Sequence, residues 1–116
     1  MESASTRSPL QPRILLFDPD LHHAREVIDA LRYCKCEIVA VHTVERMTDN
    51  LNESEFTVLI VADNRIVSWR AVVQHAQKLA EERRRALHIL YLARAYRGPH
   101  DRLEAEKHGV RFLYES

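Results

Sequence analysis

Five short apolar runs recur along the chain, and each is rich in isoleucine, leucine or valine. The runs are continuous rather than alternating, a pattern typical of strands that are buried on both faces of a parallel sheet. Longer amphipathic segments separate each run from the next. The predicted strands are residues 13–17, 37–41, 56–62, 87–92 and 110–114.

The segments between the strands predict four helices. The first, residues 21–34, carries apolar side chains at i, i+3, i+4 and i+7, which form one face of a helix. The third begins near Trp69 and has the clearest apolar stripe, whereas 44–51 is short and 99–108 is weakly patterned, with Gly109 as a natural stop. The stripe of the first helix consists of Ala24, Val27, Ile28 and Leu31.

Strands that alternate with helices predict βαβ units with right-handed crossovers. The expected fold class is therefore α/β, a doubly wound five-stranded parallel sheet of the flavodoxin-like type with strand order 2-1-3-4-5. Residues 1–11 are expected to form a disordered tail, and residues 12–116 a single domain. In such sheets ligands bind at the carboxyl ends of the strands.

The last predicted strand ends just before Ser116, so a fifth helix is expected to be absent. A sheet of this kind normally carries that helix beside the first one, and without it the first helix is expected to be half covered. An uncovered apolar patch indicates either a chain cut before its fifth helix or an interface. The interface would be with a protein partner, an output domain or a second copy in a homodimer. The predicted contact residues are Ala24, Val27, Ile28, Leu31, Val110, Phe112 and Tyr114.

Composition narrows the class of protein. The 17 basic residues balance the 17 acidic ones, which argues against general attraction to nucleic acid or to an anionic membrane. No apolar run approaches the roughly 20 residues of a membrane span, and the N-terminus lacks the pattern of a signal peptide. Cys34 and Cys36 are too few for a disulfide framework and are expected to be reduced thiols, so the predicted location is the cytoplasm.

An acidic turn, Asp18-Pro19-Asp20, directly follows the first predicted strand. Several α/β folds place a cation or phosphate site there, but the proline has no side chain that could bind either. Asp20 precedes a helix and is a natural N-cap, and Asp63 is a candidate cap for the helix near Trp69.

Three histidines are expected near the same edge of the sheet, namely His22, His23 and His42. Their spacing matches no closed metal site, so surface positions are favoured over metal binding.

The chain resembles the receiver domain of bacterial two-component response regulators. The resemblance spans residues 13–115 and rests on 13–20, 56–63, 92–95 and 104–113. It implies a site in which two acids after the first strand hold Mg²⁺ and an aspartate at the end of the third accepts a phosphoryl group. A threonine or serine after the fourth strand and a lysine after the fifth would bind the phosphoryl oxygens. Metal and lysine are needed because the transferred group carries charge that must be neutralised.

Only the first of these family positions is matched directly, by Asp18. Pro19 stands where the second acid should be, Ala62 at the acceptor position, Ala93 at the hydroxyl position and Glu115 at the lysine position. A carboxylate at position 115 would repel an aspartyl phosphate instead of neutralising it.

The leading hypothesis is a degenerate receiver, or pseudo-receiver, that acts in signalling and protein interaction without phosphorylation, enzyme activity or a cofactor. The alternative is an atypical receiver phosphorylated on Asp63 by a histidine kinase, with Asp18, Asp20 and Asp63 holding Mg²⁺; it requires a one-residue shift at the end of the third strand. A third hypothesis, a flavodoxin-like ligand binder, lacks a glycine-rich phosphate loop, since the glycines are Gly98 and Gly109 alone.

Overall fold

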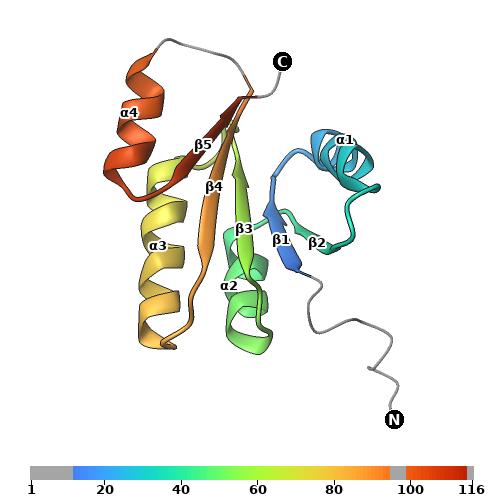
Figure 1. The fold of residues 1–116 in the computed structure, drawn as a ribbon, viewed down its shortest axis with the longest axis horizontal. Helices are drawn as coiled ribbons and strands as arrows, with labels where there is room; N and C mark the ends of the chain where they lie inside the picture. The colour runs from blue at the N-terminus through green and yellow to red at the C-terminus, as the bar shows by residue number, and fades with distance from the viewer. Residues whose placement is uncertain (1–11, 95–98, 115–116) are drawn as a thin grey trace.

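Strands and helices alternate along the chain as the apolar runs predicted (Figure 1). The computed structural model describes residues 12–94 and 99–114, so the predicted tail, 1–11, lies outside the described residues. The strands are β1 (Arg13–Phe17), β2 (Glu37–Val41), β3 (Val58–Ala62), β4 (His88–Ala93) and β5 (Arg111–Tyr114). The helices of the described residues are α1 (Leu21–Leu31), α2 (Val44–Glu53), α3 (Trp69–Glu82) and α4 (Pro99–Lys107).

The five strands form one parallel sheet in the order β2-β1-β3-β4-β5. This arrangement confirms the predicted fold class and strand order. Because β1 and β3 are neighbours at the centre, the loops that follow their carboxyl ends meet at the point where the strand order reverses. That point is where open α/β sheets build their ligand sites.

Several element boundaries differ from the prediction because an apolar run and a hydrogen-bonded strand need not coincide. Phe56 and Val110 are buried in the core but lie just before β3 and β5. The first helix ends at Leu31 rather than at residue 34. The next residue, Arg32, caps it by donating its backbone N–H to the carbonyl of Asp29. At Phe56 and Val110 burial therefore extends beyond the hydrogen-bonded ladder.

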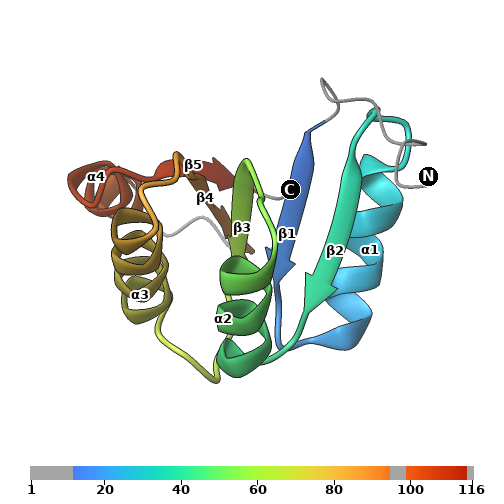
Figure 2. The same cartoon turned by 90° about the horizontal axis from the view of Figure 1, so that it is seen from below.

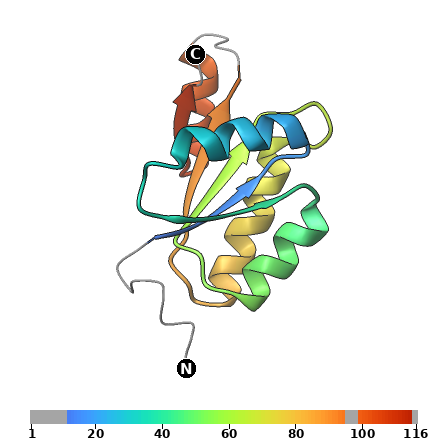
Figure 3. The same cartoon turned by 90° about the vertical axis from the view of Figure 1, so that its right-hand side faces the viewer.

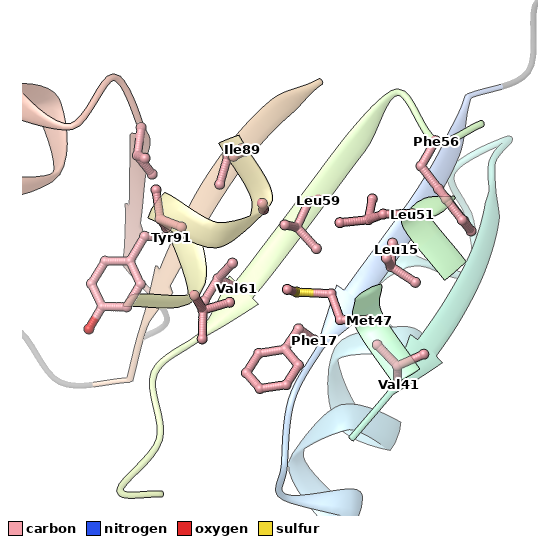
Figure 4. Close-up of a cluster of buried hydrophobic side chains, with 14 of the residues drawn as sticks. Leu15, Phe17, Val41, Met47, Leu51, Phe56, Leu59, Val61, Ile89 and Tyr91 are labelled. Atoms are coloured by element: carbon pink, nitrogen blue, oxygen red, sulfur yellow. The ribbon is translucent and has the colours of Figure 1, made fainter. Parts of the chain in front are cut away.

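The larger part of the core lies between the sheet and helices α2 and α3 (Figures 2 and 4). One row of side chains crosses this face of the sheet, with Phe17, Val61 and Tyr91 on successive strands of the register. Met47 of α2 is fully buried over the same region. These contacts hold the central strands in place beneath the loops of the site.

On the opposite face of the sheet α1 covers the part beside β1 and β2 (Figures 2 and 3). The sequence predicted that the apolar stripe of α1 would contact a partner, and this is wrong for Ala24 and Val27, which are only 2% and 6% exposed. Both pack against Leu16 and Ile60 of the sheet. Ile28 and Leu31 of the same stripe are half-buried, so a partner contact there stays a prediction.

The predicted contact residues near β5 differ in their outcome. Val110 is buried and Phe112 is half-buried, and both pack with the cluster on the α2 and α3 side. They therefore do not extend the face of α1. The side chain of Tyr114 lies outside the described part of the chain. Among the described residues no helix is long and apolar enough to cross a membrane.

Truncating the core should destabilise the fold far more than truncating an exposed leucine. Leu59 is fully buried on β3, so we expect Leu59→Ala to lower the free energy of unfolding by about 2–5 kcal/mol. Leu103→Ala is the matched control, because Leu103 is 57% exposed and its loss should cost less than about 0.5 kcal/mol. Urea unfolding followed by circular dichroism measures both, and similar midpoints would contradict this account of the core.

Candidate functional site

A cleft of about 610 Å³ opens at the carboxyl ends of the central strands. It lies where the sequence predicted a ligand site, and it brings together residues from the loops after β1, β3 and β4. Its lining includes two acids and two arginines. The lining residues are Pro19, Asp20, Asp63, Asn64, Arg65, Ile66 and Arg94.

Asp18 is the one residue that matches its family position directly, and it does not line this cleft. Its side chain is fully buried, with 0% exposed. One carboxylate oxygen contacts Nδ1 of His23, and the other accepts the backbone N–H of Asp20 at 3.0 Å. Both oxygens are therefore occupied by the protein itself. His23, on the first turn of α1, is almost fully buried as well.

The buried pair also ties the ends of two strands together. The backbone N–H of Asp18 donates to the carbonyl of Val41 at 3.0 Å, and Nδ1 of His42 donates to the carbonyl of Asp18 at 2.9 Å. The bond from His42 fixes the proton of that imidazole on Nδ1. Asp18 thus connects β1, the end of β2 and the start of α1 through its backbone and side chain.

The three histidines near this edge do not form a metal site. His22 is exposed and pairs with Glu26 at 3.5 Å, while His23 and His42 contact different atoms of Asp18. Within residues 12–94 and 99–114 no group of three or more histidine, cysteine or acidic side chains could hold a metal ion. The predicted Mg²⁺ ligands Asp18, Asp20 and Asp63 are accordingly not gathered around one point.

Asp20 caps α1, as the sequence predicted. Its carboxylate accepts the backbone N–H groups of His22 and His23 at 3.1 Å each. The second oxygen accepts a hydrogen bond from Arg94, which follows β4, at 3.3 Å. The hydrogen bond from the His23 backbone, helped by the charge of Arg94, lowers the pKa of Asp20 below its ordinary value.

Asp63 follows β3 directly and borders the cleft. Its backbone N–H donates to the carbonyl of Leu92 at 2.9 Å, which continues the ladder one residue beyond the strand. Its predicted capping role is wrong, because Ser68 is the residue before α3. Asn64 shapes the turn instead: its side-chain oxygen accepts the N–H groups of Ile66 and Val67 at 2.8 Å each.

The remaining family positions offer little chemistry. Ala62 and Ala93 are both buried and end in methyl groups, so neither can donate or accept a hydrogen bond through its side chain. Pro19 borders the cleft without a polar side-chain atom. Glu115 lies outside the described residues.

Two residues of this region were not predicted as part of a site. His23 was assigned to a group of histidines without a partner, and Arg94 was part of a family motif without a role of its own. Arg94 reaches Asp20 across 74 positions of sequence, which no local pattern reveals. A polar residue at an otherwise core-facing position of α1 was the available signal for His23.

The comparisons with known proteins agree with the fold. No family model matches the sequence, and no curated protein matches it significantly. The receiver domain of a Francisella response regulator is similar in structure, with a TM-score of 0.72 at 13% identity, covering 90% of this chain and 84% of that chain. At identities this low the likeness establishes the fold alone.

Two further solved structures show how widely this fold is used. An adenylate cyclase from Rhodopirellula baltica has a TM-score of 0.73 at 23% identity, covering 91% of this chain and 77% of that chain. A co-crystal structure from Saccharomyces cerevisiae contains the histidine phosphotransfer protein Ypd1 and the receiver domain of the response regulator Ssk1. The matching chain of that complex is similar to this one with a TM-score of 0.74 at 11% identity, covering 90% of this chain and 79% of the matching chain. The chain therefore has the receiver fold.

Removing the imidazole from the buried pair should strongly destabilise the protein. We expect His23→Ala to lower the free energy of unfolding by about 3 kcal/mol, because it leaves the Asp18 carboxylate buried without that partner. His22→Ala is the neighbouring control and should cost less than about 0.5 kcal/mol, since His22 is exposed.

The pair can be isolated by a double-mutant cycle in urea. The double variant Asp18→Asn/His23→Ala no longer buries a carboxylate that has lost its imidazole partner. Its loss of unfolding free energy should therefore be smaller than the sum of the losses of the two single variants, by about 1 kcal/mol or more. Strict additivity would show that the contact between the two side chains contributes nothing of its own.

The stabilising effect of Asp20 should depend on pH in one direction. Because the pKa of Asp20 is lowered in the folded state, its stabilisation is present above the unfolded pKa of about 4 and is lost as the pH falls through the folded value. Asp20→Ala should therefore be less stable than the native chain at pH 7, and the difference should narrow in acid. Urea midpoints measured from pH 7 downwards test this, and a difference independent of pH would contradict it.

Proposed function

We propose that this chain is a receiver-like signalling module that binds a protein partner and does not use phosphoryl transfer. It has no enzyme activity and needs no cofactor in this role. The cytoplasm, predicted from the sequence, is the location that fits such a module. The single observation that supports the proposal best is the state of Asp18, whose two carboxylate oxygens are occupied by His23 and by the backbone of Asp20.

A phosphoryl site needs a cation held by carboxylates that face the incoming group. In this chain the imidazole of His23 lies against Asp18 inside the protein, where a metal ion would need an open carboxylate. Asp20 is occupied by the cap of α1 and by Arg94. Binding Mg²⁺ would require breaking these contacts, in addition to replacing the ligand that Pro19 cannot supply.

Arg94 supports the same conclusion from the other side of the cleft. It follows Ala93, at the strand end where a working receiver carries its hydroxyl group, and its guanidinium extends to Asp20. An ion pair between partly exposed groups adds little stability. Its consequence here is electrostatic, because it neutralises an acid that a metal site would need to keep free.

The alternative function, an atypical receiver phosphorylated on Asp63, retains one favourable observation. Asp63 borders the cleft, and among the described residues no hydrogen bond to its carboxylate is found. A phosphodonor could therefore reach it. The alternative still lacks the lysine that the resemblance implies, since position 115 carries a carboxylate, and the guanidinium of Arg94 is paired with Asp20.

A homodimer was one of the partners expected from the sequence. The proposal places the partner contact on the α1-facing side of β3 to β5 instead of on α1 itself, because Ala24 and Val27 are buried. A homodimer would have to use this same face.

Beryllofluoride with Mg²⁺ should produce no saturable change in the fluorescence of Trp69. This residue begins α3 and stacks on Tyr91 with ring centroids 4.5 Å apart, so it reports on the loop after β3 and on β4. Urea unfolding of the same sample shows that the signal responds to structure. Mass spectrometry after incubation with acetyl phosphate should find no phosphorylated chain.

Asp63→Ala is the matched control and should behave as the native chain does in both assays. A saturable response of the native chain that this substitution abolishes would refute the proposal and establish the alternative.

A further inference from the structure

One half of the α1-facing side of the sheet is incompletely covered. Residues paired across the register of parallel strands share a face, so Leu16, Ile60, Leu90 and Arg111 form one row from β1 to β5. Burial decreases along this row with distance from α1. Leu16 and Ile60 are buried, Leu90 is half-buried and Arg111 is exposed.

The neighbouring rows follow the same trend. Leu92 is half-buried, and its partner in the register, Leu113, is 36% exposed. At the other end of the strands, Val58 is half-buried while its partner His88 is exposed. We call this surface the open shelf, and it consists of Val58, His88, Leu90, Leu92, Arg111 and Leu113.

The chemistry of the open shelf is apolar with a basic end. Leucines occupy its middle and its carboxyl end, while His88 and Arg111 lie toward the amino ends of β4 and β5. None of β3, β4 and β5 contains an acidic residue. A groove of about 810 Å³ at the β5 edge of the sheet is lined by His88, Arg111 and Leu90. It also includes residues of the other face and of α4, where Glu106 is accompanied by Arg102, so basic groups outnumber acids around it.

The shape of this face favours a helix as its occupant. α1 stands on the same face beside β1 and β2 (Figure 2), so a second sheet could not lie flat across the remaining strands. Helices pack about 8–10 Å apart, and a helix is about 10 Å wide with its side chains, so one more helix fits next to α1. Parallel sheets are normally covered on both faces in this way.

A second copy of this chain is a poor occupant. The apolar stripes of α1, α2 and α3 are buried within the fold, with Val27, Met47 and Val73 among their buried members. The remaining described helix, α4, has Leu103 as its only large apolar side chain. The described part of the chain therefore offers no free apolar helix that a second molecule could insert.

We propose that the open shelf docks an amphipathic α-helix of a partner protein. Its leucine-type stripe packs on Leu90, Leu92 and Leu113, and acidic side chains at one end lie over Arg111 and His88. This inference rests on the proposed function and specifies the class of partner. It does not depend on the chemistry of the cleft, so the beryllofluoride experiment and the one below can fail separately.

Three synthetic peptides of about 18 residues test the proposal. One has a leucine stripe with glutamates at one end, the second has the same stripe with lysines there, and the third has the leucines replaced by glutamine. Leucine methyl NMR signals of the full chain are followed up to about millimolar peptide. We expect saturable shifts of Leu90, Leu92 and Leu113, an affinity about fivefold higher for the glutamate peptide, and no saturation with the third.

Two variants localise the contact. Leu113→Asp should weaken binding of the glutamate peptide by about tenfold or more, whereas Leu103→Asp, a matched exposed leucine on α4, should leave it unchanged. Arg111→Glu should reverse the preference in favour of the lysine peptide. Leu113, Leu103 and Arg111 are all exposed, and circular dichroism establishes that each variant is folded.

Three outcomes would overturn the proposal. The first is the absence of any shift in the shelf leucines at millimolar peptide. The second is equal binding of the two charged peptides, which would show that acidic side chains on the partner helix contribute nothing to binding. The third is a dimer in light scattering of the peptide-free chain that Leu113→Asp dissociates, because the shelf would then be occupied by a second copy.

Discussion

A carboxylate that water cannot reach must find its hydrogen-bond partners within the protein, and much of this fold is arranged around one such group. Asp18 is fully buried at the end of β1, and its oxygens are satisfied by His23 and by the backbone of Asp20. Its own N–H and carbonyl connect to Val41 and His42 at the end of β2. The start of α1 and the neighbouring strand ends are therefore positioned by a single residue.

At the edge of the sheet after β1, the acidic side chains are engaged by neighbouring groups of the same chain. The polar groups are still present, but they are directed at one another: Asp18 at His23, and Asp20 at the first turn of α1 and at Arg94. Buried polar networks are stable when every member is satisfied, and a metal ion would have to compete with those internal partners. These contacts join β1, β2, α1 and the loop after β4 at this edge.

Sequence patterns located the strands because apolar runs of buried parallel strands are long and continuous, and they located the Asp20 cap because capping is local. They did not locate the partner of Asp20 in Arg94 or the role of His23, since both depend on loops brought together by the strand order. The stripe of α1 was identified correctly as apolar, but what it packs against was not, because periodicity shows which residues share a face and not what covers that face.

The sequence by itself determined the class of fold and the order of its elements. It also determined that positions 19 and 93 offer no polar side-chain atom, because proline and alanine lack one in any conformation. Only the tertiary structure decided that Asp18 is buried against His23, that Asp63 borders the cleft beside Asp20, and that the uncovered apolar surface lies at Leu90, Leu92 and Leu113. These facts follow from the sheet register and from the position of α1 on one side of it. Such long-range relations are set by packing and are not encoded in any short stretch of the chain.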